Sequence, residues 1–286
     1  MATFFGEVLS VYSRAVEEDE DDVEDENEED QQIRREMELK REVHVEWCSE
    51  ITQSVMNSSE KTLQCSDFVI AVGCNAAGFL SAYVLNSGDW TAVGSVSLWN
   101  ERSSGSSRQS GVPSQGEPSC VFYRQRDCPS VLICLCTCYV AEDQLFQWTE
   151  KVFGYIQRRG LSVMVLSDRS MAEYKTPDSL FSSGVPFLRA LKSSLYGSQI
   201  LCPLLEQPNI VTGLQAAVLS HCQVHRIPAV LYQCYSDVIS ADSVTMETYK
   251  PALTCLRKLV KLKTCPSTEI LKKLVRVNEV QSNLYT

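Results

Sequence analysis

The sequence predicts a single α/β domain with a mostly parallel β-sheet flanked by helices, preceded by an acidic N-terminal arm. Short runs of β-forming residues alternate with segments of helical periodicity, which is typical of parallel strands joined by helices. The 286 residues suit one large domain, and a hydrophobic content of 44% is ample for its core. Residues 17–30 hold twelve of the 36 acidic residues, and the other 24 nearly balance the 26 Lys and Arg.

The acidic tract sets the expected domain boundaries. A block of like charges repels itself, so residues 17–30 are expected to be disordered. We assign residues 1–45 to an N-terminal arm, residues 46–277 to the α/β domain and residues 278–286 to a C-terminal tail. The net charge of −10 disfavours nucleic acid as a partner. The sequence predicts neither a membrane span nor a secretory signal. We therefore expect a cytoplasmic location.

The expected elements follow in chain order. Residues 31–60 favour a helix passing into a strand. Strands are expected at 68–72, 94–100, 131–140, 161–168 and 228–237, and a short helix or extended segment at 186–191. Helices are expected at 74–85, 141–159, 213–227, 240–262 and 267–277, with a stop at Gly160, a kink at Pro251 and an N-cap at Ser267. Residues 102–119, rich in Ser, Gly and Pro, are expected to form a flexible surface loop.

The stretch "GCNAAG" places Gly73 and Gly78 between a strand and a helix, where a phosphate-binding loop would lie. The P-loop pattern fails because Phe79 and Leu80 follow the second glycine. The dinucleotide-binding pattern fails because Asn75 stands where a glycine is needed. The helix N-terminus could still attract an anion, but a tight turn is the favoured interpretation.

Two groups of side chains could bind a metal. In "VLICLCTCYV" a strand would point Cys134, Cys136 and Cys138 to one face, yet no Cys-x-x-Cys spacing occurs among the 13 cysteines. Buried apolar packing is therefore favoured over zinc. In "HCQVH" His221 and His225 share one helical face, but no third ligand is identified, which favours a solvated or hydrogen-bonded pair. No nucleophile motif is found.

The stretch "CPLLEQPNIVTGLQAAVLSHCQVHRIPAVLYQCYSD", residues 202–237, resembles the proteasome assembly chaperones of vertebrates. The resemblance extends to "MATFFGEV", to "CYVAEDQLFQWTEKVFG", to "STEILKKL" and to the acidic arm, so it covers nearly the whole chain. It implies an α/β fold similar to nucleoside phosphorylase-like folds. It also implies a non-enzymatic function without cofactor or metal.

The resemblance further implies partners. Such a chaperone forms a heterodimer with a second, related proteasome assembly chaperone. The heterodimer binds α-type subunits of the 20S proteasome, the fifth and seventh among them, promotes α-ring formation and prevents aberrant α-ring dimerisation. The implied location is the cytoplasm, extending to the nucleus or the endoplasmic reticulum. The alternative function is a nucleoside phosphorylase-like enzyme that uses the Gly73 turn for phosphate.

The last three residues, Leu284, Tyr285 and Thr286, fit the hydrophobic–tyrosine–any-residue ending that proteasome activators and these chaperones insert between α-subunits. A terminal carboxylate can pair with a lysine of such a pocket. The tyrosine ring is rigid and its hydroxyl can find a hydrogen-bond partner. Because exposed termini are usually inert, the motif indicates a binding site only together with the resemblance of the whole chain.

Overall fold

The computed structural model describes residues 28–98, 120–126, 128–176, 185–238, 240–253 and 266–272. The chain divides into two compact units, residues 1–40 and residues 41–286. In the first unit, helix α1 (Glu28–Lys40) is described. Its first three residues, 28–30, belong to the tract predicted to be disordered, and the rest of that tract lies outside the described residues. Acidic side chains in the first turn of a helix offset the positive end of its dipole, which stabilises a helical start there.

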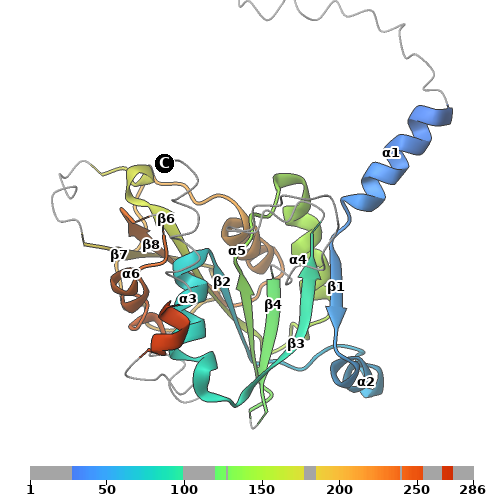
Figure 1. Cartoon of the computed structure of the whole chain (residues 1–286), viewed down its shortest axis with the longest axis horizontal. Helices are drawn as coiled ribbons and strands as arrows, with labels where there is room; N and C mark the ends of the chain where they lie inside the picture. Colours follow the sequence, from blue (N-terminus) through green and yellow to red (C-terminus); the bar gives the residue numbers. More distant parts are fainter. Residues whose placement is uncertain are drawn as a thin grey trace, which may run out of the picture. The chain divides into compact units, whose positions relative to one another are not determined.

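The second unit is built on one eight-stranded sheet, with the strand order β1-β3-β4-β5-β2-β6-β8-β7 (Figure 1). The four central strands β5, β2, β6 and β8 run parallel, and the flanking strands pair antiparallel. The strands are β1 (His44–Trp47), β2 (Asp67–Val72), β3 (Trp90–Ser97), β4 (Cys120–Gln125), β5 (Val131–Cys136), β6 (Ser162–Ser170), β7 (Phe187–Lys192) and β8 (Ala229–Ser236).

Helices cover both faces of this sheet. The α-helices in the described part of this unit are α2 (Ser49–Asn57), α3 (Cys74–Tyr83), α4 (Leu145–Gly154), α5 (Leu214–Val224) and α6 (Ser243–Glu247), and residues 268–272 are also helical. Helices α3 and α6 pack on one face, and α4 and α5 on the other (Figure 1). None of the helices in the described ranges is both long and apolar enough to cross a membrane.

The alternation of strand β2 shows why its sequence is continuously apolar. Phe68 and Ile70 point to the α4–α5 side, whereas Val69 and Ala71 point to the α3–α6 side, and all four are buried. Successive side chains of a strand point to opposite faces, so a strand covered on both sides needs apolar residues at every position. The central position of β2 follows from this pattern.

The predicted α/β class and the single helix-flanked sheet are confirmed, and three details differ. Parallel pairing is confined to the four central strands, whereas β1, β3, β4 and β7 pair antiparallel with their neighbours. Strand β4 was not predicted. Helix α4 ends at Gly154, so Gly160 is not its stop; Gly160 instead has a φ of +77° in the turn before β6.

Some of the remaining predicted elements lie within the described residues and others lie outside them. The segment at 186–191 is the strand β7 rather than a helix. Ser267 lies at the start of the helical stretch 268–272, as predicted, and its Oγ accepts a hydrogen bond from Ile270 N at 3.5 Å. The predicted loop at 102–119, residues 254–262 and the tail at 278–286 lie outside the described residues.

Candidate functional site

The strand-to-helix turn at Gly73 is closed by a carboxylate of the chain itself. Gly73 has a φ of +102°, a conformation that favours glycine, and it precedes the first residue of α3. Asp168 extends from β6, the parallel neighbour of β2, just beyond the register pair Val72–Ser167. A Cβ atom on Gly73 would lie 2.4 Å from Asp168 Oδ1, so glycine is required for space as well as for conformation.

The Asp168 carboxylate takes the place that an anionic ligand would occupy at this helix N-terminus. The backbone N–H of Ala76 donates to Asp168 Oδ1 at 3.1 Å, and Asn75 also hydrogen-bonds to this carboxylate. Burial raises the pKa of Asp168 to about 6, although these hydrogen bonds oppose the increase. Two of the N–H groups that begin α3, those of Asn75 and Ala76, are thereby satisfied within the chain.

This geometry does not favour the nucleoside phosphorylase-like alternative. A phosphate at the turn would have to displace Asp168 or lie against a carboxylate, and like charges repel. Asn75, where the dinucleotide pattern needs glycine, is a buried tether instead. Its Oδ1 accepts from Asp242 N at 2.7 Å, and its Nδ2 donates to Ser240 O at 3.3 Å. The turn therefore joins α3 to the segment that leads into α6.

The two predicted histidines do lie together, and the structure supplies the third group that the sequence did not reveal. Glu150 Oε1 on α4 lies 3.2 Å from His221 Nδ1 and 3.5 Å from His225 Nε2. The two imidazole ring centres are 4.2 Å apart, and the ring of His221 stacks on that of Phe153. Burial, then the nearby His225, lowers the pKa of His221 to about 4.

Arg158 decides what this Glu–His–His cluster can do. Its Nη1 lies 2.9 Å from His225 Nδ1. A guanidinium only donates, so His225 Nδ1 accepts, which places the imidazole N–H on Nε2, the ring nitrogen that faces Glu150. A metal ion would need the lone pair of this Nε2 and would move the proton to Nδ1, against the guanidinium. The cluster is best described as the hydrogen-bonded histidine pair that the sequence favoured, bridging α4 and α5.

The three predicted cysteines Cys134, Cys136 and Cys138 are buried on the α4–α5 face of the sheet, as expected for core residues. Two of them join Cys120 from β4, which the sequence did not place with them because β4 was not predicted. The side-chain hydrogen bonds of Cys120 with Cys136 and Cys138, together with burial, raise its pKa well above the usual range. Without a bound cation, the Cys120 thiol therefore stays protonated at neutral pH.

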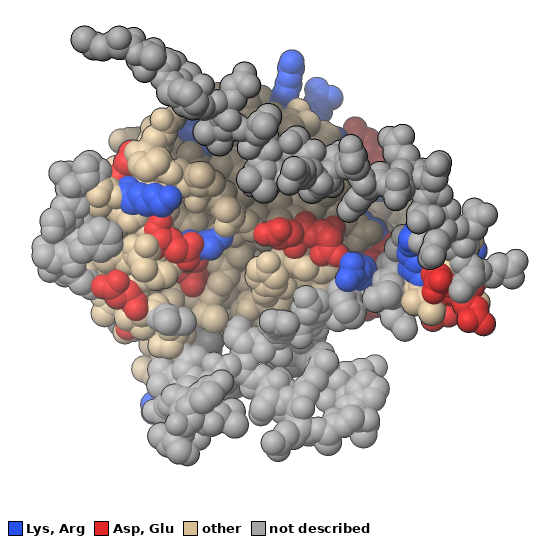
Figure 2. All heavy atoms as spheres, turned by 90° about the horizontal axis from the view of Figure 1, so that it is seen from above, with Lys and Arg blue, Asp and Glu red and all other residues tan. Residues whose placement is uncertain are grey.

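The surface charges and the tail complete the comparison with the sequence. On the face seen in Figure 2, described basic side chains are interspersed with acidic ones. This pattern agrees with the near balance of charges outside the acidic tract and is unlike the basic stripe typical of nucleic-acid binding.

The predicted binding residues Leu284, Tyr285 and Thr286 lie outside the described residues.

Comparisons with known proteins identify the family. The PAC1 family model, described as "Proteasome assembly chaperone 4", matches residues 1–286. A relative from Danio rerio called "Proteasome assembly chaperone 1" is 58% identical and covers 100% of both chains, and one of the same name from Xenopus laevis is 53% identical over the same shares.

A likeness of fold accompanies this match in sequence. The crystal structure of Pyrococcus furiosus PbaA, described as an archaeal homolog of proteasome-assembly chaperone, superposes with a TM-score of 0.53 at 11% identity. The superposition covers 85% of this chain and 92% of that one. At this identity the likeness concerns the fold alone. The full-length matches in sequence show that the chain belongs to the proteasome assembly chaperone family.

Proposed function

We propose that this chain is a non-enzymatic chaperone of 20S proteasome assembly that acts as a heterodimer with a second, related chaperone. The observation that carries the proposal is the match over the whole length with relatives named "Proteasome assembly chaperone 1". The Gly73 turn supports it, because Asp168 fills the place where the alternative enzyme would bind phosphate. The heterodimer promotes α-ring formation and prevents aberrant α-ring dimerisation.

The proposed partners are the second proteasome assembly chaperone and α-type subunits of the 20S proteasome, including the fifth and seventh. The proposed location is the cytoplasm, with extension to the nucleus or the endoplasmic reticulum. A direct test is co-expression of the full chain with the second chaperone, followed by purification with each α-type subunit. A chain that remains a monomer beside the second chaperone and captures no α-type subunit would contradict the proposal.

Within this function, we assign the contact with the α-ring to the tail. The Thr286 carboxylate would pair with a lysine in a pocket between two α-subunits, Tyr285 would place its ring in the pocket, and Leu284 would fill an apolar cleft. A hydrogen bond to a charged group contributes about 1.5–3 kcal/mol, which is roughly a 10- to 150-fold change in affinity. Docking of the folded unit raises the effective concentration of the tail at its pocket.

The tail is tested with variants that leave the folded unit intact. Deletion of 284–286, Tyr285→Ala, and addition of one glycine after Thr286 should each weaken binding of the heterodimer to purified α-rings at least tenfold. The added glycine keeps every side chain and only moves the carboxylate. Ser282→Ala is the matched control, since it changes a tail residue outside the motif. Affinities are measured by surface plasmon resonance.

The outcomes separate the tail from the rest of the function. Loss of α-ring affinity with intact heterodimer formation supports the tail as the contact. Unchanged affinity in all three tail variants would contradict this role, while capture of α-type subunits would still support the chaperone function. Equal weakening by Ser282→Ala would show that the motif is not specific.

A further inference from the structure

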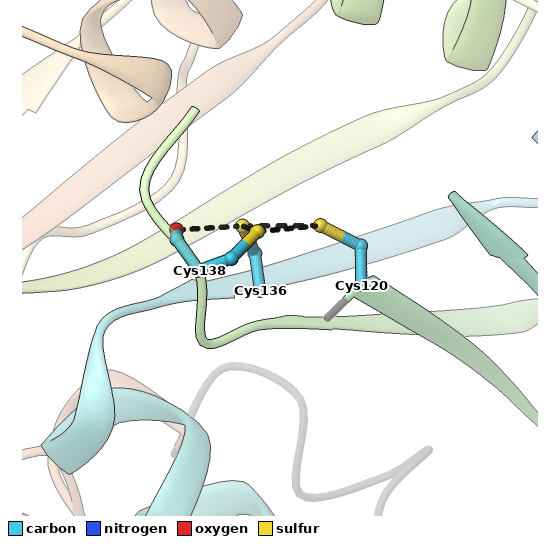
Figure 3. Close-up of side chains that lie close together, drawn as sticks. All are labelled: Cys120, Cys136 and Cys138. Atoms are coloured by element: carbon cyan, nitrogen blue, oxygen red, sulfur yellow. Dashed lines mark hydrogen bonds between the residues drawn. The ribbon is translucent and has the colours of Figure 1, made fainter. Parts of the chain in front are cut away.

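The Cys120, Cys136 and Cys138 side chains form a three-sulfur cluster that neither the histidine pair nor the tail explains. Cys120 and Cys136 are direct partners in the antiparallel register of β4 and β5, and Cys138 follows the end of β5 on the same face. Figure 3 shows the Cys120 side chain extending from β4 toward the other two sulfurs. The cluster is in the core, where Cys120 and Cys136 are fully buried and Cys138 is 7% exposed.

The spacing of the sulfurs is close to that of ligands around one metal ion. The Sγ–Sγ distances are 3.2 Å for Cys120–Cys136, 3.7 Å for Cys120–Cys138 and 3.9 Å for Cys136–Cys138. Three sulfurs each about 2.3 Å from a central metal in one plane lie about 4 Å apart. Two of the three pairs thus fit within about 0.3 Å, and the third, Cys120–Cys136, must open by about 0.8 Å.

We propose that Cys120, Cys136 and Cys138 form a three-coordinate site for a thiophilic d¹⁰ cation, Cu(I). Soft thiolate ligands select Cu(I) and zinc from the common metals. Structural zinc is almost always tetrahedral, and the described His, Cys, Asp and Glu side chains supply only these three ligands. The Cys138 carbonyl oxygen lies on the far side of the Cys136 and Cys138 sulfurs from Cys120, so it does not complete a tetrahedron (Figure 3).

Charge limits how the ion is held. Binding as two thiolates and one neutral thiol releases two protons to solvent and leaves one net negative charge in the pocket. Three thiolates would leave two negative charges, and burial of each uncompensated charge is costly. Cys134 does not take part, although it points to the same face of β5 and is equally buried. It therefore provides a matched control on the same strand.

The test is a competition titration of the reduced full-length chain with Cu(I) under anaerobic conditions, with bicinchoninate as the coloured competing chelator. The wild-type chain and Cys134→Ala should each remove one Cu(I) per chain from the chelator. Cys136→Ala and Cys138→Ala should bind it at least tenfold more weakly. Cys138 lies after the end of β5, outside the paired strands. Cys138→Ala therefore still tests the site if Cys136→Ala does not fold. Circular dichroism checks folding of each variant.

Several results would overturn the proposal. One is a wild-type chain that removes no Cu(I) from the chelator, and another is an equal loss in Cys134→Ala. Zinc bound in place of Cu(I) in a parallel titration would refute the three-coordinate assignment. A Cys120–Cys136 disulfide, mapped by mass spectrometry in chain purified without reductant, would also refute the site, since two of its sulfurs would then be bonded to each other.

Discussion

Replacing Asp168 with asparagine should change the pH dependence of folding stability by an amount that follows from one buried carboxyl. Asparagine has the same shape, and its Oδ1 can still accept the hydrogen bond from Ala76 N. It removes the negative charge that the wild-type chain buries beside α3. The variant therefore separates the charge of Asp168 from its packing.

The magnitude comes from the pKa of this carboxyl. Burial raises it from 3.8 to about 6 in the folded chain. Because the folded state binds this proton more tightly than the unfolded state, the carboxyl's contribution to the free energy of unfolding is complete below about pH 3.8. It is lost as the pH rises through 6, by about 3 kcal/mol in total. Between pH 5 and pH 8 the loss is about 1–2 kcal/mol.

The assay is urea denaturation of the wild-type chain and Asp168→Asn at pH 5 and pH 8. The free energy of unfolding of the variant should rise relative to that of the wild type by about 1–2 kcal/mol between these pH values. A constant offset from the altered hydrogen bonds, about 1 kcal/mol, cancels in this comparison. Glu50→Gln, which removes an exposed carboxylate on α2, controls for the general effect of net charge.

The reasoning would be refuted if the difference in the free energy of unfolding between the variant and the wild type were the same at both pH values. If the free energy of unfolding of the variant instead fell relative to that of the wild type as the pH rose, the helix N-terminus would hold the pKa of Asp168 below its usual value. In that case the carboxylate would be a stabilising cap.

Three further changes test the packing and the electrostatics. Gly73→Ala should lower the free energy of unfolding by about 1–3 kcal/mol more than Gly88→Ala does, as measured by urea denaturation. Both glycines have positive φ, but only at Gly73 would the added Cβ collide with Asp168. Equal losses in the two variants would contradict this steric argument. Trp148→Ala should cost about 3–5 kcal/mol in the same assay, since the ring is fully buried on α4. Phe146→Ala on that helix should stay within about 0.5 kcal/mol because Phe146 is 75% exposed, and similar values for the two would contradict the packing described. His221→Phe should remove a stability loss that the wild type shows as the pH falls from 6.5 toward 4, because the folded chain binds this proton more weakly than the unfolded chain. Urea denaturation at pH 4.5 and pH 7 measures this loss, and His44→Gln, which changes an exposed histidine, is the control. If the variant keeps the pH dependence of the wild type, another group causes it.

Local patterns in the sequence were sufficient for the class of fold. The apolar run of β2 and the small residues after Gly73 predict a buried strand followed by a helix, since these signals lie within a few residues of one another. The alternation of Cys134, Cys136 and Cys138 was enough to place them on one face. Strand β4 was missed because it begins directly after a Ser-, Gly- and Pro-rich stretch, which hides where the strand starts.

Local sequence patterns did not reveal which side chains from distant parts of the chain lie together. Asp168 is 95 residues beyond Gly73, and its role depends on β6 lying next to β2. Cys120 meets Cys136 only because β4 and β5 pair in a particular register. Glu150 joins His221 because α4 and α5 cover the same face. Strand order and register are set by the packing of the whole domain, which no single segment encodes.

The sequence by itself determined the α/β class, most of the strands and helices, and through its full-length resemblance the family. Those properties depend on local periodicity and on residue identity, which the chain carries directly. Only the tertiary structure decided that the Gly73 turn is filled by Asp168, that Arg158 fixes the proton of His225, and that three of the 13 cysteines converge. Each depends on distances between residues far apart in the sequence, and folding alone sets those distances.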